Sequence, residues 1–512
     1  MSYLVGIDLG STSLKAAIYD LAGHAVAKAS RPTQVFNPDP AHPDWAIWKP
    51  EQIWGGTAEA LREAVSRLDD PKKIRAVAVT GMGMDGVPMD KEGRWLYPFI
   101  SWHCPRTAPQ HAWWVEHIGA EKQFAISGNP LWAIKSALRI LWMRENEPAI
   151  LDKTDKWLLI EDFLNFMLCG VRATDYSMAS NTLLLDQRTR RYSDELLRLS
   201  GIERRWLCDP LPSGTPLGEV HAQAAAATGL PAGTPVILGG HDFLCGMLPV
   251  GAFKPGVVLD VMGTWDIVTV AIEQPVLTPA VQRMGWWIDS HVARDMYVAM
   301  GTAVSADMLE WFRREYGQPE KAQAAAAGGK DWDYLMAAAE ASPPGAHGVM
   351  FLPHMSGCTI PVPDPKSKGA FIGLRNIATK GDMIRAVIEG LNYQFLEIMA
   401  GLETAVGVTP QKLVAGGGGT SNRFWMQNRA DMAGRAIEAP AVEETTPLGA
   451  AILAGIGVGL YKNEEDAFRQ VYRPGRVYEP DLKLTAFYAE RFEVFRKIYP
   501  ALKGICAESP TA

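Results

Sequence analysis

The chain opens with Tyr3-Leu-Val-Gly-Ile-Asp-Leu-Gly-Ser-Thr-Ser-Leu-Lys-Ala-Ala-Ile-Tyr-Asp20, and this stretch decides the fold. Apolar residues over 3–8 and 14–20 predict two strands, and the Gly, Ser and Thr between them predict the turn of a hairpin. A third strand is predicted over 24–30, a helix over 50–66 and a buried strand over 74–80. We therefore expect a strand meander, a helix and a further strand.

The second half repeats this order of elements. Residues 256–262 and 266–272 predict strands on either side of the turn Gly263-Thr-Trp265, residues 382–406 predict a long helix, and residues 412–415 predict a strand. Two long halves that match only in the order of their elements indicate an internal duplication. We place the boundary near Val250, with one domain over 1–250 and the other over 251–512.

The composition favours small-molecule chemistry. A chain of 512 residues, 47% hydrophobic, is too long for one core and predicts two large domains. The net charge of −7 gives no reason to expect nucleic acid, and six scattered cysteines predict reduced thiols and no zinc site. Asp8 interrupts the first apolar run, which argues against a secretory signal, and no apolar stretch is long enough for a bilayer. We expect a soluble, cytoplasmic protein with no membrane partner.

The first hairpin turn is a candidate phosphate site. Asp8 ends a strand, Gly10 lets a ligand approach the backbone, and the hydroxyls that follow can bond phosphate oxygens. These hydroxyls belong to Ser11, Thr12 and Ser13. The turn is not a P-loop, because no Gly-x-x-x-x-Gly-Lys-Ser/Thr occurs, and an ordinary polar hairpin turn is an equal alternative. The matching turn at Gly263 and Thr264 favours two loops that clamp a polyphosphate.

A run of four glycines, Gly416 to Gly419, follows the strand over 412–415. Small residues there would let a flat ring lie against the backbone, with Asn422 near enough to bond its edge. A flexible turn is the alternative interpretation.

Asp242 follows the buried strand Thr234-Pro-Val-Ile-Leu238 and Gly239-Gly-His241. Ligands of α/β sheets collect at the carboxyl ends of strands, and a carboxylate there could accept a hydroxyl proton during phosphoryl transfer. The alternative is a helix N-cap, for which aspartate is among the preferred residues.

Two segments near the end of the strand over 74–80 could bind a sugar ring. Gly83-Met-Asp-Gly-Val87 supplies Asp85, and Ile100-Ser-Trp-His-Cys-Pro-Arg106 supplies Trp102. Aromatic faces stack on sugar C–H groups and carboxylates accept from sugar hydroxyls. With 17 tryptophans in the chain, Trp102 taken alone would more often be a core residue.

These segments together resemble the FGGY carbohydrate kinases from the first strand to about Tyr461. The strongest match is Gly369-Ala-Phe-Ile-Gly-Leu374, seven residues, and then Asp382-Met-Ile-Arg-Ala-Val-Ile-Glu389. A looser match is Ser136-Ala-Leu-Arg-Ile-Leu-Trp-Met-Arg-Glu-Asn146, with Arg139 where the family usually has lysine. Thr446-Pro-Leu-Gly-Ala-Ala-Ile-Leu453 also resembles a segment of the family's nucleotide domain.

The resemblance implies an α/β protein with the duplicated actin-like (ribonuclease H-like) ATPase fold, whose two domains enclose a catalytic cleft for ATP, Mg²⁺ and a sugar. In that frame Asp242 is the general base and Asp8 holds Mg²⁺ through water. The phosphate loops are Gly10, Ser11, Thr12 and Ser13 on one side and Gly263 and Thr264 on the other. The adenosine pocket is Gly417, Gly418, Gly419 and Asn422. The sugar pocket is Met84, Asp85 and Trp102.

The resemblance also bears on the substrate. Residues 100–107 and Gly240-His-Asp242 look more like L-fuculose kinases than xylulose kinases, which favours an L-fuculose-like deoxyketose or a ketopentose such as xylulose. Glycerol or a small polyol is the alternative within the enzyme class. An actin-like ATP switch without transfer activity, or a sugar sensor, is the alternative from another class. A homodimer remains an open alternative to a monomer.

Overall fold

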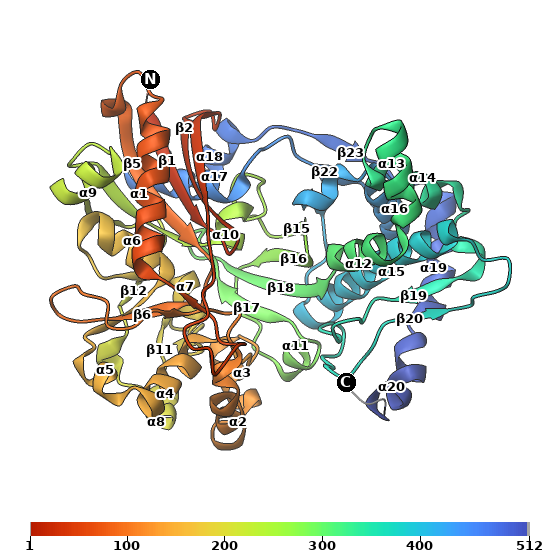
Figure 1. Cartoon of the computed structure of the whole chain (residues 1–512), viewed down its shortest axis with the longest axis horizontal. Helices are drawn as coiled ribbons and strands as arrows, with labels where there is room; N and C mark the ends of the chain where they lie inside the picture. The colour runs from red at the N-terminus through yellow and green to blue at the C-terminus, as the bar shows by residue number, and fades with distance from the viewer. Residues whose placement is uncertain (1, 509–512) are drawn as a thin grey trace.

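The computed structural model describes residues 2–508, and each half of the chain is built around one mixed β-sheet (Figure 1). The first sheet has the order β13-β14-β5-β1-β2-β3 and the second the order β17-β18-β16-β15-β21-β22-β23. The strands of the first sheet are β1 (Tyr3–Leu9), β2 (Ser13–Asp20), β3 (Ala25–Pro32), β5 (Ile74–Gly81), β13 (Pro216–Glu219) and β14 (Pro235–His241). Those of the second are β15 (Val257–Met262), β16 (Trp265–Ile272), β17 (Trp287–Ser290), β18 (Tyr297–Val304), β21 (Lys412–Gly416), β22 (Ile437–Ala439) and β23 (Arg476–Tyr478).

The two sheets share one pattern of strand pairing. In the first, β1 pairs with β2 and β2 with β3 in antiparallel fashion, β1, β5 and β14 run parallel, and β13 closes the edge antiparallel. In the second, β15, β16 and β18 correspond to β1, β2 and β3, while β21, β22 and β23 correspond to β5, β14 and β13. The duplication predicted from the order of elements is confirmed.

Helices cover the sheets, and each half also contains short two-stranded sheets (Figure 1). In the first half the helices are α1 (Pro50–Ser66), α2 (Ala108–His117), α3 (Ala120–Ser127), α4 (Ser136–Asn146), α5 (Pro148–Lys153), α6 (Ile160–Cys169), α7 (Tyr176–Ser180), α8 (Asp194–Ser200), α9 (Ala222–Thr228) and α10 (Asp242–Met247). In the second they are α11 (Pro279–Arg283), α12 (Ala306–Tyr316), α13 (Gln318–Ala327), α14 (Asp331–Ala341), α15 (Lys380–Gly401), α16 (Arg423–Ala433), α17 (Thr445–Gly457), α18 (Glu464–Val471), α19 (Leu482–Phe495) and α20 (Ile498–Glu508). The short pairs are β4 (Ile47–Trp48) with β7 (Phe99–Ile100), β6 (Gly86–Met89) with β8 (Lys156–Leu159), β9 (Thr174–Asp175) with β12 (Pro210–Leu211), β10 (Leu185–Asp186) with β11 (Arg191–Tyr192), and β19 (Met350–Leu352) with β20 (Ala370–Ile372).

The helix α17 belongs by sequence to the second half but lies against the first sheet (Figure 1). Gly6 of β1 is so close to this helix that an added Cβ would stand 1.8 Å from the carbonyl oxygen of Pro447. Gly449 of α17, two residues after Pro447, likewise has the carbonyl oxygen of Cys245 at 1.9 Å from where its Cβ would be. The boundary near Val250 stays a prediction, and contacts of this kind cross it.

The halves meet a second time through β17. The backbone N–H of Ile288 donates to the carbonyl of Gly128 at 2.8 Å, and Asn129 Nδ2 donates to Asp289. Ser290 Oγ donates to Gln187 Oε1 at 2.8 Å. The two halves thus contact each other through α17 and through β17, and buried apolar residues of both also form one cluster. No helix within residues 2–508 has the length and hydropathy to cross a membrane.

Candidate active site

Asp8 is a carboxylate at the carboxyl end of β1, next to the first hairpin turn. In the antiparallel register it stands opposite Lys15, but Lys15 Nζ pairs instead with Glu444 Oε2 at 2.6 Å. Burial raises the pKa of Asp8 to about 7, helped by the nearby negative charges of Asp242 and Glu444 and opposed by Lys15. Asp8 lies near the end of β1 and Asp242 begins α10, far apart in the sequence, yet the charge of Asp242 reaches Asp8 in the folded chain.

This pair of carboxylates has the chemistry of a divalent-cation site. Magnesium is bound through one or two carboxylates, with water and substrate phosphates completing its shell. Asp8 has no hydrogen-bonding side chain among the groups that shift its pKa, so its oxygens remain available to a cation or its waters. Within residues 2–508 no group of three or more His, Cys, Asp or Glu could hold a metal by itself. The residues present thus fit a metal that arrives with a nucleotide.

Asp242 is the first residue of α10, and His241 occupies the N-cap position, so the side chain of Asp242 does not act as the cap. Its Oδ1 accepts from the backbone N–H of Phe243 at 2.7 Å and lies 2.8 Å from His241 Nδ1. The side chain is 20% exposed. One carboxylate oxygen is therefore held by the protein and the other can accept a proton from a ligand.

Behind Asp242 lies a buried polar network that the sequence analysis missed. Burial alone would lower the pKa of His241, but the charges of Asp242 and Asp289 outweigh it and raise that pKa. Lys135 Nζ donates to Asn181 Oδ1 at 2.7 Å and also to Asn129, and burial lowers the pKa of Lys135 to about 8. His241 lies in a segment that the sequence singles out, but Lys135, Asn129 and Asn181 belong to no quoted motif, so the sequence gives no signal that they form a network with it.

Asp85 and Trp102, which the sequence places in a sugar pocket, are neighbours. Asp85 Oδ2 accepts from Trp48 Nε1 at 2.6 Å and from the backbone N–H of Trp102 at 3.2 Å. Asp85 Oδ1 lies 2.8 Å from Arg139 Nη1, and both side chains are buried. Burial raises the pKa of Asp85 and Arg139 opposes that rise. The carboxylate already has protein partners on both oxygens, whereas the Trp102 side chain is partly exposed. Their role with a sugar stays a prediction.

Met84 adopts a left-handed backbone conformation that is unusual for a residue with a long side chain, with φ of 83°. Its carbonyl accepts from Ser136 Oγ and from Arg139 Nη1, each at 2.6 Å. Residues held in such conformations cluster at functional sites, because surrounding contacts must maintain them. Arg139, in the looser family motif, thus holds the main chain of Met84 and the carboxylate of Asp85 together.

The two hairpin turns have matching backbone bonds. Gly10 N–H donates to the carbonyl of Ser13 at 3.1 Å, and Gly263 N–H donates to the carbonyl of Trp265 at 3.0 Å. Thr12 and Thr264 occupy matching places in the turns and are exposed. The sequence placed hydroxyls at these turns, and both threonines can be reached by a ligand.

The glycine turn packs against the second hairpin. A Cβ at Gly417 would stand 2.6 Å from the carbonyl oxygen of Met262, and one at Gly419 would stand 2.7 Å from Met262 Cβ. Gly418 is exposed and has nothing within 4 Å of where its Cβ would be. Asn422 caps α16 by accepting from Trp425 N–H at 3.1 Å. The structure thus brings the adenosine candidates beside Gly263.

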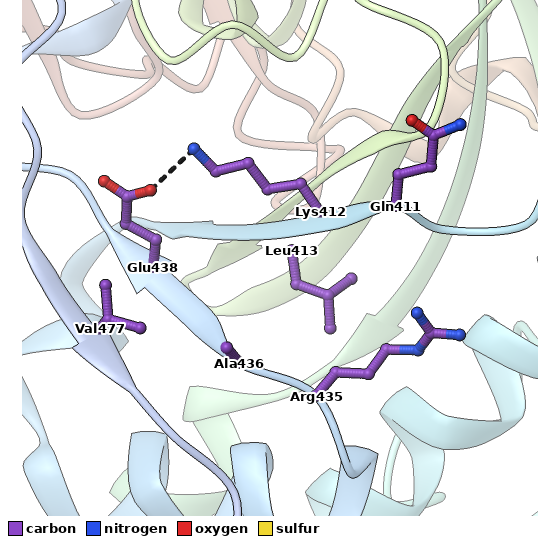
Figure 2. Close-up of a pocket in the computed structure, with 7 residues that line it drawn as sticks. All are labelled: Gln411, Lys412, Leu413, Arg435, Ala436, Glu438 and Val477. Atoms are coloured by element: carbon purple, nitrogen blue, oxygen red, sulfur yellow. Dashed lines mark ion pairs between the residues drawn. The ribbon is translucent and has the colours of Figure 1, made fainter.

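A cavity of about 310 Å³ lies at the opposite end of β21 from this turn (Figure 2). Lys412 Nζ and Glu438 Oε2, both in its lining, form an ion pair of 2.7 Å, and Arg435 also lines it. None of the predicted site residues lines it. The candidate site is therefore defined by the side chains and turns described above.

Family models match both halves of the chain. Residues 3–249 match the N-terminal domain of the FGGY family of carbohydrate kinases, and residues 259–458 match its C-terminal domain. The chain belongs to the FGGY family of carbohydrate kinases. It is an enzyme of that class, a phosphotransferase that acts on sugar hydroxyl groups, and the family uses ATP.

Relatives match the FGGY chain along nearly its whole length. It is 31% identical to an L-fuculokinase of Escherichia coli K12 over 93% of this chain and 96% of that protein. It is 28% identical to a xylulose kinase of Bacillus subtilis over 99% and 98% of the two chains. A xylulose kinase structure from Rhodospirillum rubrum has a TM-score of 0.89 at 29% identity and covers 99% of this chain and 100% of that one. The predicted family and the actin-like fold are both confirmed.

Proposed function

We propose that this carbohydrate kinase transfers the γ-phosphoryl group of ATP to a hydroxyl of a small ketose, either an L-fuculose-like deoxyketose or a ketopentose such as xylulose. The near full-length similarity to an L-fuculokinase and to xylulose kinases supports this substrate class. Glycerol or a small polyol is the alternative substrate class.

One observation carries the proposed mechanism: Asp242 has one oxygen engaged by Phe243 N–H and His241, and the side chain remains partly exposed. In this proposal the second oxygen accepts the hydroxyl proton of the sugar as the new O–P bond forms and the bond to ADP breaks. The charge of Asp242 reaches Asp8 and raises its pKa, so in this proposal the counter-ion of the phosphoryl group would be held in the same part of the site as the base.

The other candidates supply positioning and charge. Backbone and hydroxyl groups of the turns at Gly10 and Gly263 donate to phosphate oxygens, and the glycine turn with Asn422 faces the adenosine. Met84, Asp85 and Trp102 form the sugar side. Mg²⁺ near Asp8 would neutralise phosphate charge, which is most of what phosphoryl transfer requires of its catalyst.

The substrate is identified by coupled ADP release against a panel of ketoses. The panel contains L-fuculose, D- and L-xylulose, D- and L-ribulose and erythrulose, with glycerol and no sugar as controls. One strong ketose responder supports the proposal, and a response to glycerol alone moves the assignment to the polyol class. Turnover that no acceptor changes would indicate an ATP switch, and sugar binding without product would indicate a sensor.

The base is tested with Asp242→Asn. We expect turnover to fall roughly 100- to 10,000-fold, the usual contribution of a positioned general base, while nucleotide affinity persists. Asp194→Asn is a matched control because Asp194 is also the first residue of a short helix, α8. An Asp242→Asn enzyme as fast as the control would reject Asp242 as the base.

A further inference from the structure

Arg429 is a fully buried arginine on α16, the helix that follows the glycine turn. Its Nη1 and Nη2 contact Asp266 Oδ1 and Oδ2 at 3.1 and 2.7 Å, and Nη1 also contacts Asp260. Its Nε donates to Asn392 Oδ1 of α15 at 2.8 Å. A single guanidinium thus joins α16 to β15, β16 and α15.

The two carboxylates meet because of the strand register. Asp260 of β15 pairs with Val268 of β16, and Met262 pairs with Asp266. Side chains two residues apart point to the same face, so the aspartates are diagonal neighbours on the face that α16 covers. Burial raises the pKa of Asp260 well above its usual range, and Arg429 opposes that rise.

Burying this ion cluster is a poor way to stabilise a core. Removing charges from water costs several kcal/mol per ion, and well-packed apolar residues often do as well or better. What the cluster does provide is geometry: a planar arginine fork fixes both the distance and the angle between the elements it joins. The cluster is therefore better explained by a role in fixing the positions of these elements than by a gain in stability.

The elements it joins are the two nucleotide segments. Asp260 and Asp266 flank the turn at Gly263 and Thr264, three residues before Gly263 and two after Thr264. On the other side, Arg429 lies on the helix that Asn422 caps, and the glycine turn touches Met262 with no room for a side chain at Gly417. Trp425 Nε1 also donates to Asn392 Oδ1, at 2.9 Å.

We propose that Arg429 is a positioning residue for the nucleotide, which holds the glycine turn at the adenosine end in register with the Gly263 turn at the phosphate end. This inference rests on the proposed assignment of both turns to ATP. With the fork intact, ATP meets two surfaces whose spacing is already set, and no binding energy is used to assemble them. The sugar residues lie in the other half and do not contact this cluster.

The test is Arg429→Lys, which keeps the charge and loses the fork. We expect the KM for ATP and the Kd for ADP to rise about tenfold, as for a pair coupled by about 1.4 kcal/mol, with the KM for the sugar unchanged. Arg385→Lys is the control: Arg385 is also buried and pairs with Glu389 at 2.8 Å in the same half, but its hydrogen bonds join α15 to α19 through Tyr488, and it meets α16 only over the ring of Phe424. Equal ADP affinity in the two variants would overturn the inference.

A second variant covers the case in which Arg429→Lys does not fold. Arg429→Met combined with Asp260→Asn and Asp266→Asn leaves no unpaired charge and is expected to fold with the same weakened ADP binding. Normal ADP binding by this folded protein would overturn the inference.

Two ligand-facing variants separate this result from failure of the proposed site. Thr264→Val and Gly418→Val change groups that are exposed, and Gly418 has open space around its Cβ position. If they weaken ADP binding while Arg429→Lys does not, the site stands and the positioning role fails. If neither they nor Arg429→Lys weaken it, the nucleotide assignment itself fails.

Discussion

At the scale of single residues, Asp8 makes the unliganded protein sensitive to pH. Burial and the neighbouring Asp242 raise its pKa from 3.8 to about 7 in the folded chain. The folded state therefore binds a proton between about pH 4 and pH 7 that the unfolded state has released. The stability that this proton contributes is complete below pH 4 and is lost as the pH rises through 7.

Asp8→Asn isolates this effect, since an amide cannot ionise. We compare the free energy of unfolding of the variant with that of wild type at pH 5 and at pH 7.5. The difference should shift in favour of the variant by more than about 1 kcal/mol, the equivalent of roughly one pKa unit, as the pH rises between these values. Urea unfolding without nucleotide or Mg²⁺ at the two pH values measures it. If the two free energies of unfolding differ by the same amount at both pH values, Asp8 ionises with its ordinary pKa.

The residues of the site differ in how far the sequence could predict them. Asp8 and Asp242 can be predicted as candidates because each lies at or just after the end of an apolar strand, and the carboxyl ends of parallel strands meet at one edge of the sheet. Asp85 was chosen as a sugar ligand, yet its carboxylate is occupied by Trp48, Trp102 and Arg139, which are distant in the sequence. These contacts depend on the paths of the loops, and the periodic pattern of apolar residues does not predict those paths.

At the scale of elements, the packing of α17 on β1 depends on the absence of a side chain at Gly6. The backbone of Gly6 has no positive φ, so the 1.8 Å approach of Pro447 alone excludes a larger residue. We expect Gly6→Ala to lower the free energy of unfolding by about 3 kcal/mol or more, at the upper end of overpacking effects. Chemical unfolding monitored by circular dichroism measures this change.

Gly55→Ala is the control for this substitution. Gly55 lies within α1 and an added Cβ would meet nothing within 4 Å, so alanine should stabilise the protein by about 0.5–1 kcal/mol. Opposite signs for the two glycines are expected. If Gly6→Ala were neutral, the contact between α17 and the first sheet would be looser than the structure shows.

The elements themselves were largely predictable, because buried strands and amphipathic helices have clear periods. The predicted helix over 50–66 is α1, and the strand predicted over 266–272 is β16 from Trp265 to Ile272. The long helix predicted over 382–406 ends earlier, at Gly401, and a π-helical turn continues to Val406. The place of α17 on the opposite sheet could not be predicted, since it depends on a glycine whose neighbour lies more than 400 residues away.

At the scale of the whole molecule, the two ties between the halves limit how they can move. One is α17 on the first sheet, and the other is β17 against residues 128–129 and Gln187. Buried apolar residues of both halves also form one cluster, so the halves cannot separate, and rotation of one half against the other is the motion by which the site could close. Closure would exclude water from the phosphoryl group and complete the site.

We therefore expect the sugar that responds in the panel to compact the protein. A chain of 512 residues has an expected radius of gyration of about 23 Å, and hinge closure should reduce it by roughly 1 Å. Small-angle scattering of Asp242→Asn with sugar and ATP measures this while turnover is slowed. Asp289→Ala removes the partner of Asn129 where β17 contacts the first half. Because this contact is weakened, the radius of gyration of the unliganded variant should exceed that of wild type. Identical scattering with and without sugar would count against closure of the cleft by the substrate.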